Sequence, residues 1–168
     1  SSDLMAAGVP VRTAETIGMA QRGGSVLSHV RLGEGGASPL MGRGTADLIV
    51  AFEPAEAARQ LAYLRPGGCM VTSTRPVVPV SAVTGGPAYD LDAILGYLRA
   101  QVEGIVEVDA ERAAAELGSA KCLNVVLLGA AARTGELGLS SEQLAGAVRT
   151  LLPERLHALN LRALEFGA

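Results

Sequence analysis

The sequence predicts an α/β protein in which helices cover both faces of a mixed, largely parallel β-sheet and make up the C-terminal part. An apolar run at 47–52 precedes a helical pattern, and a second apolar run follows at 69–73. This order of strand, helix and strand is typical of parallel strands joined by a right-handed crossover. Past residue 109 the apolar spacing is helical. With 168 residues, 49% of them hydrophobic, the chain is predicted to form one domain that spans 1–168.

The first third of the chain predicts short strands separated by glycine-rich segments. Residues 9–14 and 25–32 have the length and alternation of strands. Residues 33–44 contain five glycines and one proline, a composition that predicts a loop. The run at 47–52 is apolar almost throughout, which predicts a central strand that is buried on both faces.

Capping residues delimit the helices that follow. Pro54 suits the first position of a helix, and Asp90 and Asp109 precede helical patterns as N-caps. Ser140 and Gln143 have the spacing of a capping box. From these signals we predict a helix at 54–64 that Pro66-Gly67-Gly68 ends, a strand at 69–73, an irregular segment at 74–89, a helix at 91–102 and a strand at 105–108. Helices at 110–118, 119–133 and 141–152 follow, Pro153 ends the last of these, and a final helix runs to about Phe166.

The predicted helix at 119–133 is apolar on every side, with Asn124 as the polar exception. A helix of this kind is buried, either in the core of its own domain or against another subunit. The pattern is compatible with both arrangements.

Composition and charge exclude several classes of protein. The net charge is −3, the aromatic content is 3% and there is no tryptophan, whereas nucleic-acid binders combine a basic surface with aromatic side chains. No apolar run approaches the length of a membrane span. The N-terminus lacks the basic and apolar regions of a signal peptide, and we therefore expect a cytoplasmic protein.

Cysteine and histidine are too few for a metal centre. The chain has two of each, Cys69, Cys122, His29 and His157, and they are scattered along the sequence. An iron–sulfur cluster normally needs four thiolates, and a zinc site needs three or four ligands. We therefore predict no metal site and no firmly bound cofactor in this chain, with both cysteines as buried thiols and both histidines as structural residues.

Other common constellations are incomplete. The segments 33–36 and 42–44 are glycine-rich, but they lack the third glycine or the following helix of a dinucleotide-binding loop. Glu15, Asp47 and Glu53 fall near strand ends, where catalytic carboxylates often lie in α/β folds. Without a partner group we interpret them as caps and surface charges.

The segment Gly18–Ser25 is the most distinctive part of the sequence. Its glycines permit left-handed backbone and close approach by another surface. Its arginine can clamp a carboxylate or a phosphate through two parallel hydrogen bonds. An ordinary loop with a surface arginine is the alternative. The candidates for substrate or partner contact are Met19, Gln21, Arg22, Gly23, Gly24 and Ser25, and no residue is assigned a catalytic role.

The sequence at 15–31, ETIGMAQRGGSVLSHVR, closely resembles the signature of the indolepyruvate:ferredoxin oxidoreductase beta subunit. That subunit corresponds to the gamma subunit or domain of the 2-oxoacid:ferredoxin oxidoreductases. Further segments that resemble the same family, in the same order, lie at 46–54, 64–68, 118–129 and 160–167. The resemblance therefore extends along nearly the whole chain.

The resemblance implies an accessory role in oxidative decarboxylation of a 2-oxoacid, with indolepyruvate or another arylpyruvate favoured. Such an enzyme makes an acyl-coenzyme A and passes electrons to ferredoxin. Thiamine diphosphate, Mg²⁺ and iron–sulfur (4Fe-4S) clusters would belong to an alpha-type partner subunit or to other domains. We therefore expect this chain to be inactive alone and to work as part of a complex with the alpha-type partner. Ferredoxin would interact with it through that complex. A dimer is also compatible with the family.

Two departures from the family pattern accompany the resemblance. Members of the family open with a strand, a GxGGQG loop and then a helix. In this sequence residues 4–8 already have the composition of that helix. Ile17 stands where a histidine is expected. We therefore predict a gamma-type domain without the leading strand and glycine loop.

Two other functions are compatible with the residues. One is a stand-alone α/β module that binds a nucleotide or coenzyme A, which titration of the pure chain with such ligands would detect. The other is a purely structural subunit, in which changes at Gln21 and Arg22 would disturb assembly alone.

Overall fold

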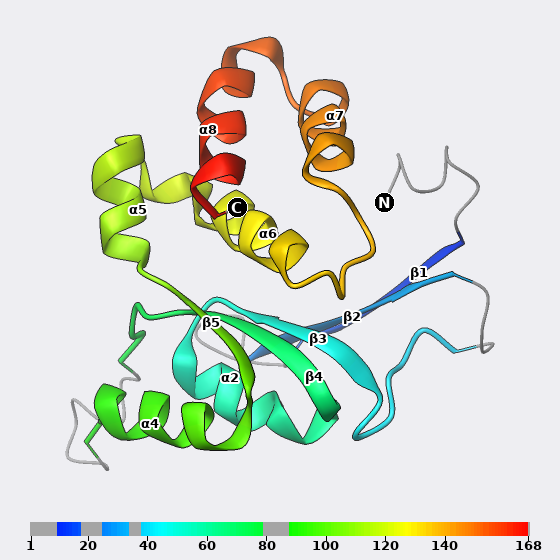
Figure 1. Cartoon of the computed structure of the whole chain (residues 1–168), viewed down its shortest axis with the longest axis vertical. Helices are drawn as coiled ribbons and strands as arrows, with labels where there is room; N and C mark the ends of the chain where they lie inside the picture. The colour runs from blue at the N-terminus through cyan, green and yellow to red at the C-terminus, as the bar shows by residue number, and fades with distance from the viewer. Residues whose placement is uncertain (1–9, 18–24, 34–37, 79–87, 168) are drawn as a thin grey trace.

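The computed structural model describes residues 10–17, 25–33, 38–78 and 88–167, and it confirms the predicted α/β class. Strands β3 (Ala46–Ala51), β4 (Leu64–Ser73) and β5 (Gly104–Val108) form a parallel sheet in the order β3-β4-β5. Strands β1 (Val11–Ile17) and β2 (Val26–Leu32) form a separate antiparallel pair. Helices lie on both sides of the parallel sheet (Figure 1), as the sequence predicts.

The central strand β4 divides the protein into two hydrophobic cores. Met70 and Val71 are both fully buried, and because neighbouring side chains of a strand point to opposite faces, they enter different cores. Burial of a side chain of this size stabilises the fold by about 1.5–3 kcal/mol. Each face of β4 therefore needs its own cover of helices.

One face is covered by α2 (Pro54–Gln60) and α4 (Leu91–Gln101). Leu98 is fully buried there beside Met70. The N-terminus of α4 is set by Asp90, whose carboxylate accepts a hydrogen bond from the Ala93 amide at 3.0 Å, as predicted. The apolar stripe of α4 thus lies against the sheet.

The other face is covered by the C-terminal helices. These are α5 (Ala110–Leu117), α6 (Leu123–Arg133), α7 (Ser141–Leu151) and α8 (His157–Gly167), with single 3₁₀ turns at Ala120–Cys122 and Glu154–Leu156. The predicted caps are confirmed: Asp109 caps α5, and Ser140 with Gln143 forms the capping box of α7. Helix α6 lies between the sheet and α8 (Figure 1), so its all-round apolar surface belongs to the core of this chain.

Helices α6 and α8 approach so closely that glycine is required where they cross. A Cβ atom at Gly129 would lie 2.2 Å from the carbonyl oxygen of Leu164, and one at Gly167 would lie 2.0 Å from that of Val126. No real side chain fits at such distances, so the two backbones are in direct contact.

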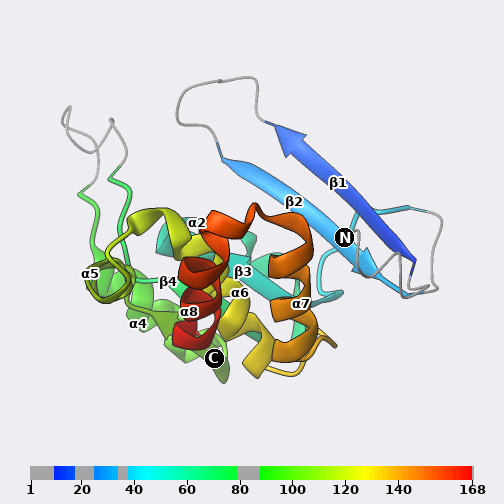
Figure 2. The same ribbon diagram turned by 90° about the horizontal axis from the view of Figure 1, so that it is seen from above.

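The antiparallel pair lies along one side of the body (Figure 2). Its register pairs Ile17 with Val26 and Val11 with Leu32. Buried His29 holds β2 to the rest of the protein, because its ring packs edge-on against Tyr63 at 5.6 Å between centroids. On the opposite face of β2, Val26 is 63% exposed.

Three predicted boundaries need correction. The strand predicted at 9–14 continues to Ile17. The helix predicted at 54–64 ends as a helix at Gln60 and a 3₁₀ turn at Leu61–Tyr63, and β4 already begins at Leu64. Gly67 adopts a positive φ of 72°, and the pairing of β4 with β3 shifts register around it. The Pro-Gly-Gly sequence therefore marks a bulge within a strand.

The strand predicted to be central is at an edge. Within the described residues β3 pairs only with β4, and the strand that is covered on both faces is β4. Val50 is 40% exposed, and Phe52, which follows β3, is 56% exposed. The prediction was wrong because an apolar run gives the character of a strand but not its place in the sheet.

None of the helices in the described ranges is long and apolar enough to cross a membrane.

We predict that Gly129→Ala destabilises the protein by about 2 kcal/mol, because the new methyl group meets a backbone carbonyl that cannot move aside alone. Urea unfolding followed by circular dichroism measures the change. Gly146→Ala in α7 is the matched control, since open space surrounds that position and alanine there adds up to ~1 kcal/mol of stability. Equal stability of Gly129→Ala and wild type would contradict the close helix contact.

Candidate functional site

Of the six predicted contact residues, the structure places one. Met19, Gln21, Arg22, Gly23 and Gly24 lie outside the described residues. Ser25 is described, and it is exposed immediately before β2. The surroundings of Ser25 therefore give the geometry at the end of the motif.

The Ser25 hydroxyl donates a hydrogen bond to Oε2 of Glu56 at 2.5 Å. Glu56 lies in the first turn of α2, which begins at Pro54 directly after the carboxyl end of β3. The other oxygen of the same carboxylate, Oε1, accepts a hydrogen bond from Arg59, one turn along the helix. Ser25 is thus attached to the edge of the sheet at which α/β proteins place their ligands.

Glu53 is the N-cap of α2 and is buried, with 7% of its surface exposed. Its Oε2 accepts the Glu56 amide at 2.8 Å, which satisfies one of the free N–H groups at the start of the helix. The interpretation of Glu53 as a cap is therefore confirmed. Its Oε1 accepts a hydrogen bond from the hydroxyl of Tyr89, so the carboxylate also holds the chain just before α4.

The environment of Tyr89 favours its neutral form. Burial, and next the hydrogen bond to the Glu53 carboxylate, raise the pKa of the Tyr89 hydroxyl above its ordinary value of 10.0. A phenol that keeps its proton remains a donor to Glu53 throughout the physiological range.

An open groove of about 400 Å³ lies beside this network, between α2 and the start of α4. Arg59 and Tyr89 belong both to the groove and to the hydrogen-bonded network. The other lining residues are small or apolar, with a second tyrosine and the α4 cap: Ala55, Ala58, Ala88, Asp90, Ala93, Ile94 and Tyr97. These groups offer hydrogen bonds, the positive charge of Arg59 and the negative charge of Asp90, so the groove has the chemistry of a binding surface.

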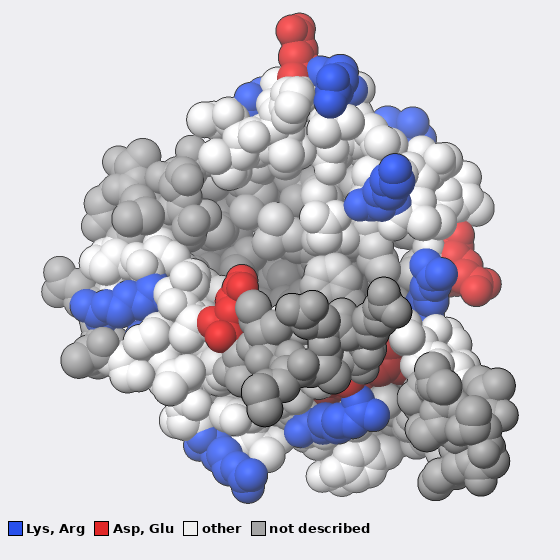
Figure 3. Space-filling view, turned by 180° about the vertical axis from the view of Figure 1, so that it is seen from behind, with Lys and Arg blue, Asp and Glu red and all other residues white. Residues whose placement is uncertain are grey.

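On the face behind the view of Figure 1, charged side chains are scattered among uncharged described residues (Figure 3). The β1–β2 pair lies on this side (Figure 2). Exposed apolar residues are found near Ser25 and Glu53 in the chain, namely Val26 and Phe52.

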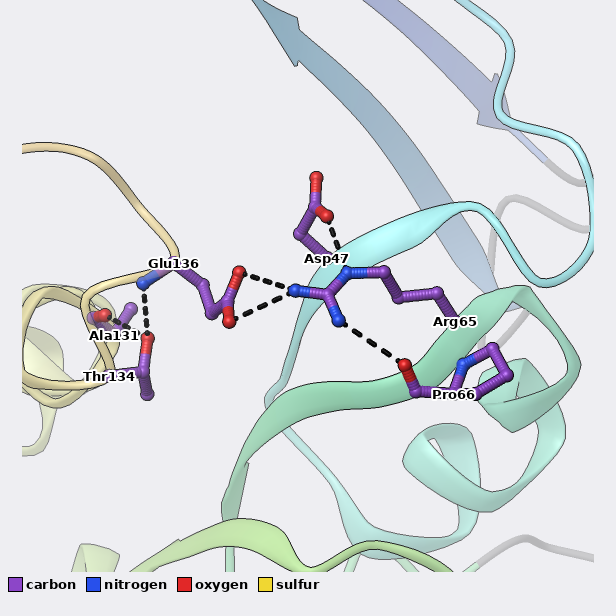
Figure 4. Close-up of polar contacts among 6 residues, drawn as sticks. All are labelled: Asp47, Arg65, Pro66, Ala131, Thr134 and Glu136. Carbon is purple, nitrogen blue, oxygen red and sulfur yellow. Dashed lines mark hydrogen bonds and ion pairs between the residues drawn. The ribbon is translucent and has the colours of Figure 1, made fainter.

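The remaining carboxylates considered from the sequence lie elsewhere. Glu15 is an exposed residue within β1. Asp47 is near the amino end of β3, where its Oδ1 accepts a hydrogen bond from Arg65 at 2.7 Å. The same guanidinium binds Glu136 at 3.0 Å and the Pro66 carbonyl (Figure 4). Asp47 therefore helps to attach the loop after α6 to the sheet. It takes no part in the Ser25 cluster, by which we mean the hydrogen-bonded residues Ser25, Glu53, Glu56, Arg59 and Tyr89.

The histidines and cysteines have structural surroundings. Nδ1 of His29 accepts the Met41 amide at 3.2 Å, and Nε2 of His157 is 2.7 Å from the Leu152 carbonyl. Cys122 is buried as predicted, whereas Cys69 is partly exposed on β4, which corrects that prediction. In the described part of the chain, no group of three or more His, Cys, Asp or Glu residues could hold a metal ion.

The sequence pointed to Glu53 but missed Glu56, Arg59 and Tyr89. Glu56 and Arg59 are three residues apart on α2, a spacing usually typical of an exposed helix surface. Tyr89 follows a segment without periodicity. The contact of Ser25 with Glu56 joins residues 31 positions apart, and that kind of proximity leaves no local sequence signal.

Comparison with known proteins identifies the family. A model of the protein family described as pyruvate ferredoxin/flavodoxin oxidoreductase matches residues 2–168. The chain belongs to this family. The matched range contains the 15–31 segment and all residues of the Ser25 cluster.

Curated relatives within the family include indolepyruvate oxidoreductase subunits IorB. The one from Archaeoglobus fulgidus is 40% identical over 97% of this chain and 81% of its own length. The one from Thermococcus kodakarensis is 39% identical over 96% of this chain and 81% of its own length. The resemblance inferred from the sequence motifs is thereby confirmed.

Solved structures of similar fold come from related enzymes. The gamma subunit of a keto/oxoacid ferredoxin oxidoreductase from Geobacter sulfurreducens superposes with a TM-score of 0.64, at 23% identity, over 97% of this chain and 80% of that one. A 2-oxoglutarate:ferredoxin oxidoreductase from Magnetococcus marinus gives 0.61 at 24% identity, over 98% of this chain and 27% of that one. At this identity the likeness establishes a shared fold.

We predict that Tyr89→Phe removes part of the alkaline loss of stability. Below about pH 10 the hydroxyl keeps its proton in both states; above it the unfolded state loses the proton first, and the wild type is destabilised as pH rises. The stability difference between wild type and variant should therefore stay constant up to about pH 9 and shrink progressively from about pH 10 upward. Urea unfolding across this range measures it. Tyr97→Phe, at a half-exposed tyrosine, is the control, and the same trend in both variants would refute the assignment to Tyr89.

Proposed function

We propose that this chain is an accessory subunit or domain of a thiamine-diphosphate-dependent 2-oxoacid:ferredoxin oxidoreductase that acts on indolepyruvate or a related arylpyruvate. The observation that carries the proposal is the 15–31 motif in a chain that matches indolepyruvate oxidoreductase subunits IorB along nearly its whole length. The chain also shares the fold of the Geobacter sulfurreducens gamma subunit, which agrees with this proposal.

The cysteines of this chain do not fit the iron–sulfur clusters of such an enzyme. Its two cysteines are half of the four thiolates that a 4Fe-4S cluster normally needs. Cys122, moreover, is buried in a hydrophobic core. We therefore place the clusters on an alpha-type partner subunit or on other domains, and the family resemblance places thiamine diphosphate and Mg²⁺ there as well.

The overall reaction defines what an accessory subunit has to support. The 2-oxoacid loses carbon dioxide, its acyl group becomes a thioester of coenzyme A with release of a proton, and the two electrons set free pass one at a time to ferredoxin. Cofactors supply this chemistry, and protein groups bind and orient the reactants. A subunit without cofactors contributes by binding, by excluding water and by holding contact residues in place.

The motif residues are suited to that contribution. In the proposed complex Met19 to Ser25 face the partner's active site, where Gln21 and Arg22 contact the substrate, coenzyme A or the partner backbone. A guanidinium binds a carboxylate or phosphate through paired hydrogen bonds, and both groups occur on these reactants. The glycines on either side permit close approach.

The first test is Arg22→Ala in the intact complex. Loss of a charge-assisted contact to substrate or coenzyme A should lower kcat/KM by about a hundredfold while the subunits still assemble. Steady-state kinetics with arylpyruvate and size-exclusion chromatography measure the two quantities. Normal turnover in a normally assembled complex would contradict the proposal, and loss of assembly alone would favour a structural subunit.

The second test concerns the isolated chain. We expect it neither to bind thiamine diphosphate nor to oxidise any 2-oxoacid, because the groups that carry the chemistry lie elsewhere. Isothermal titration and a viologen reduction assay check both points, with the assembled complex as the positive control. Oxidation of a 2-oxoacid by the pure chain would disprove an accessory role.

A further inference from the structure

Glu53 and Glu56 lie at the start of α2, and each of their four carboxylate oxygens accepts a hydrogen bond from a described residue. Oε1 and Oε2 of Glu53 accept the Tyr89 hydroxyl and the Glu56 amide. Oε1 and Oε2 of Glu56 accept Arg59 and the Ser25 hydroxyl. A carboxylate whose oxygens are all engaged is held in one orientation, which suits a fixed attachment point and does not suit proton transfer.

The Glu53 and Glu56 carboxylates have different roles. Glu53 is buried and caps the helix, so its loss would damage the fold. The Glu56 side chain does not cap α2, and it is one-third exposed. Its hydrogen bond to Ser25 is the one that reaches from α2 to the residue at which the motif joins β2.

We propose that Glu56 is a positioning residue for the reaction. Through its hydrogen bond to Ser25, the last residue of the Gly18–Ser25 motif, Glu56 holds that end of the motif against α2. The inference rests on the proposed function, in which the motif faces the partner's active site. Arg59 supports Glu56 by holding its second oxygen from the next turn of the helix. Glu56 touches neither substrate nor cofactor in this scheme and acts only through Ser25.

Geometry and chemistry favour this role over incidental surface contact. The Ser25–Glu56 distance of 2.5 Å is short, as expected for a hydroxyl that donates to an ionised carboxylate. Such bonds are stronger than neutral ones, and exclusion of water when a partner covers the exposed Ser25 strengthens them further. The attachment would therefore be firmest in the assembled enzyme.

The test uses Ser25→Ala and Glu56→Ala in the intact complex. Each change removes the same hydrogen bond, so each should raise KM for the 2-oxoacid about tenfold and leave KM for ferredoxin unchanged. The double variant should be no worse than either single one, because the two residues act through one contact. Ser25→Thr, which keeps a hydroxyl, should recover most of the loss seen with alanine.

Glu116→Ala on α5 is the matched control. It removes a comparable carboxylate that pairs with an arginine on the same helix, far from Ser25 in the chain. We expect its KM values to equal those of the wild type. Additive effects of the two alanine changes, or unchanged KM values in both, would overturn the positioning role. If Glu56→Ala prevents assembly, Ser25→Ala and Ser25→Thr decide.

The outcomes separate this inference from the proposed function. Reduced activity of Arg22→Ala with normal kinetics of Ser25→Ala and Glu56→Ala would leave the proposed function standing and reject the positioning role. Oxidation of a 2-oxoacid by the isolated chain would reject the proposed function whatever these variants do. If Arg22→Ala is normal but the Ser25 and Glu56 variants still raise KM for the 2-oxoacid, the contact role of Arg22 is rejected and the positioning role stands.

Discussion

The two-sided burial of β4 is the constraint on which the rest of the structure depends. Met70 and Val71 are fully buried in opposite cores, so neither layer of helices can be lost without exposing one of them. The strand therefore fixes β3 and β5 on its edges and the helix layers on its faces. Because β3 is fixed, the start of α2, which directly follows it, is fixed as well.

The Ser25 cluster depends on that fixed helix start. Glu53 lies between β3 and α2 and is buried by the packing of both, while Glu56 extends from the same turn to the β1–β2 pair. Tyr89 attaches the beginning of α4 to the same point. Three parts of the chain thus meet at the carboxyl end of one strand, the position at which α/β folds bring binding groups together.

The sequence predicted the elements well where local chemistry decides them. The caps at Asp90, Asp109 and Ser140 and the ends of most helices followed from nearby residues. The place of β3 in the sheet and the bulge at Gly67 were missed, because strand order and register depend on distant partners. Of the candidate site, sequence found the motif and its family, whereas the contact between Ser25 and Glu56 arises only in the folded chain.

The crossing of α6 and α8 has a practical consequence for protein engineering. Gly167 touches the backbone of α6 within the last turn of α8, where a side chain would overlap the Val126 carbonyl. Any side chain introduced at this position therefore disturbs two helices at once. Labels and reporter groups are better placed on helix surfaces away from the α6–α8 crossing.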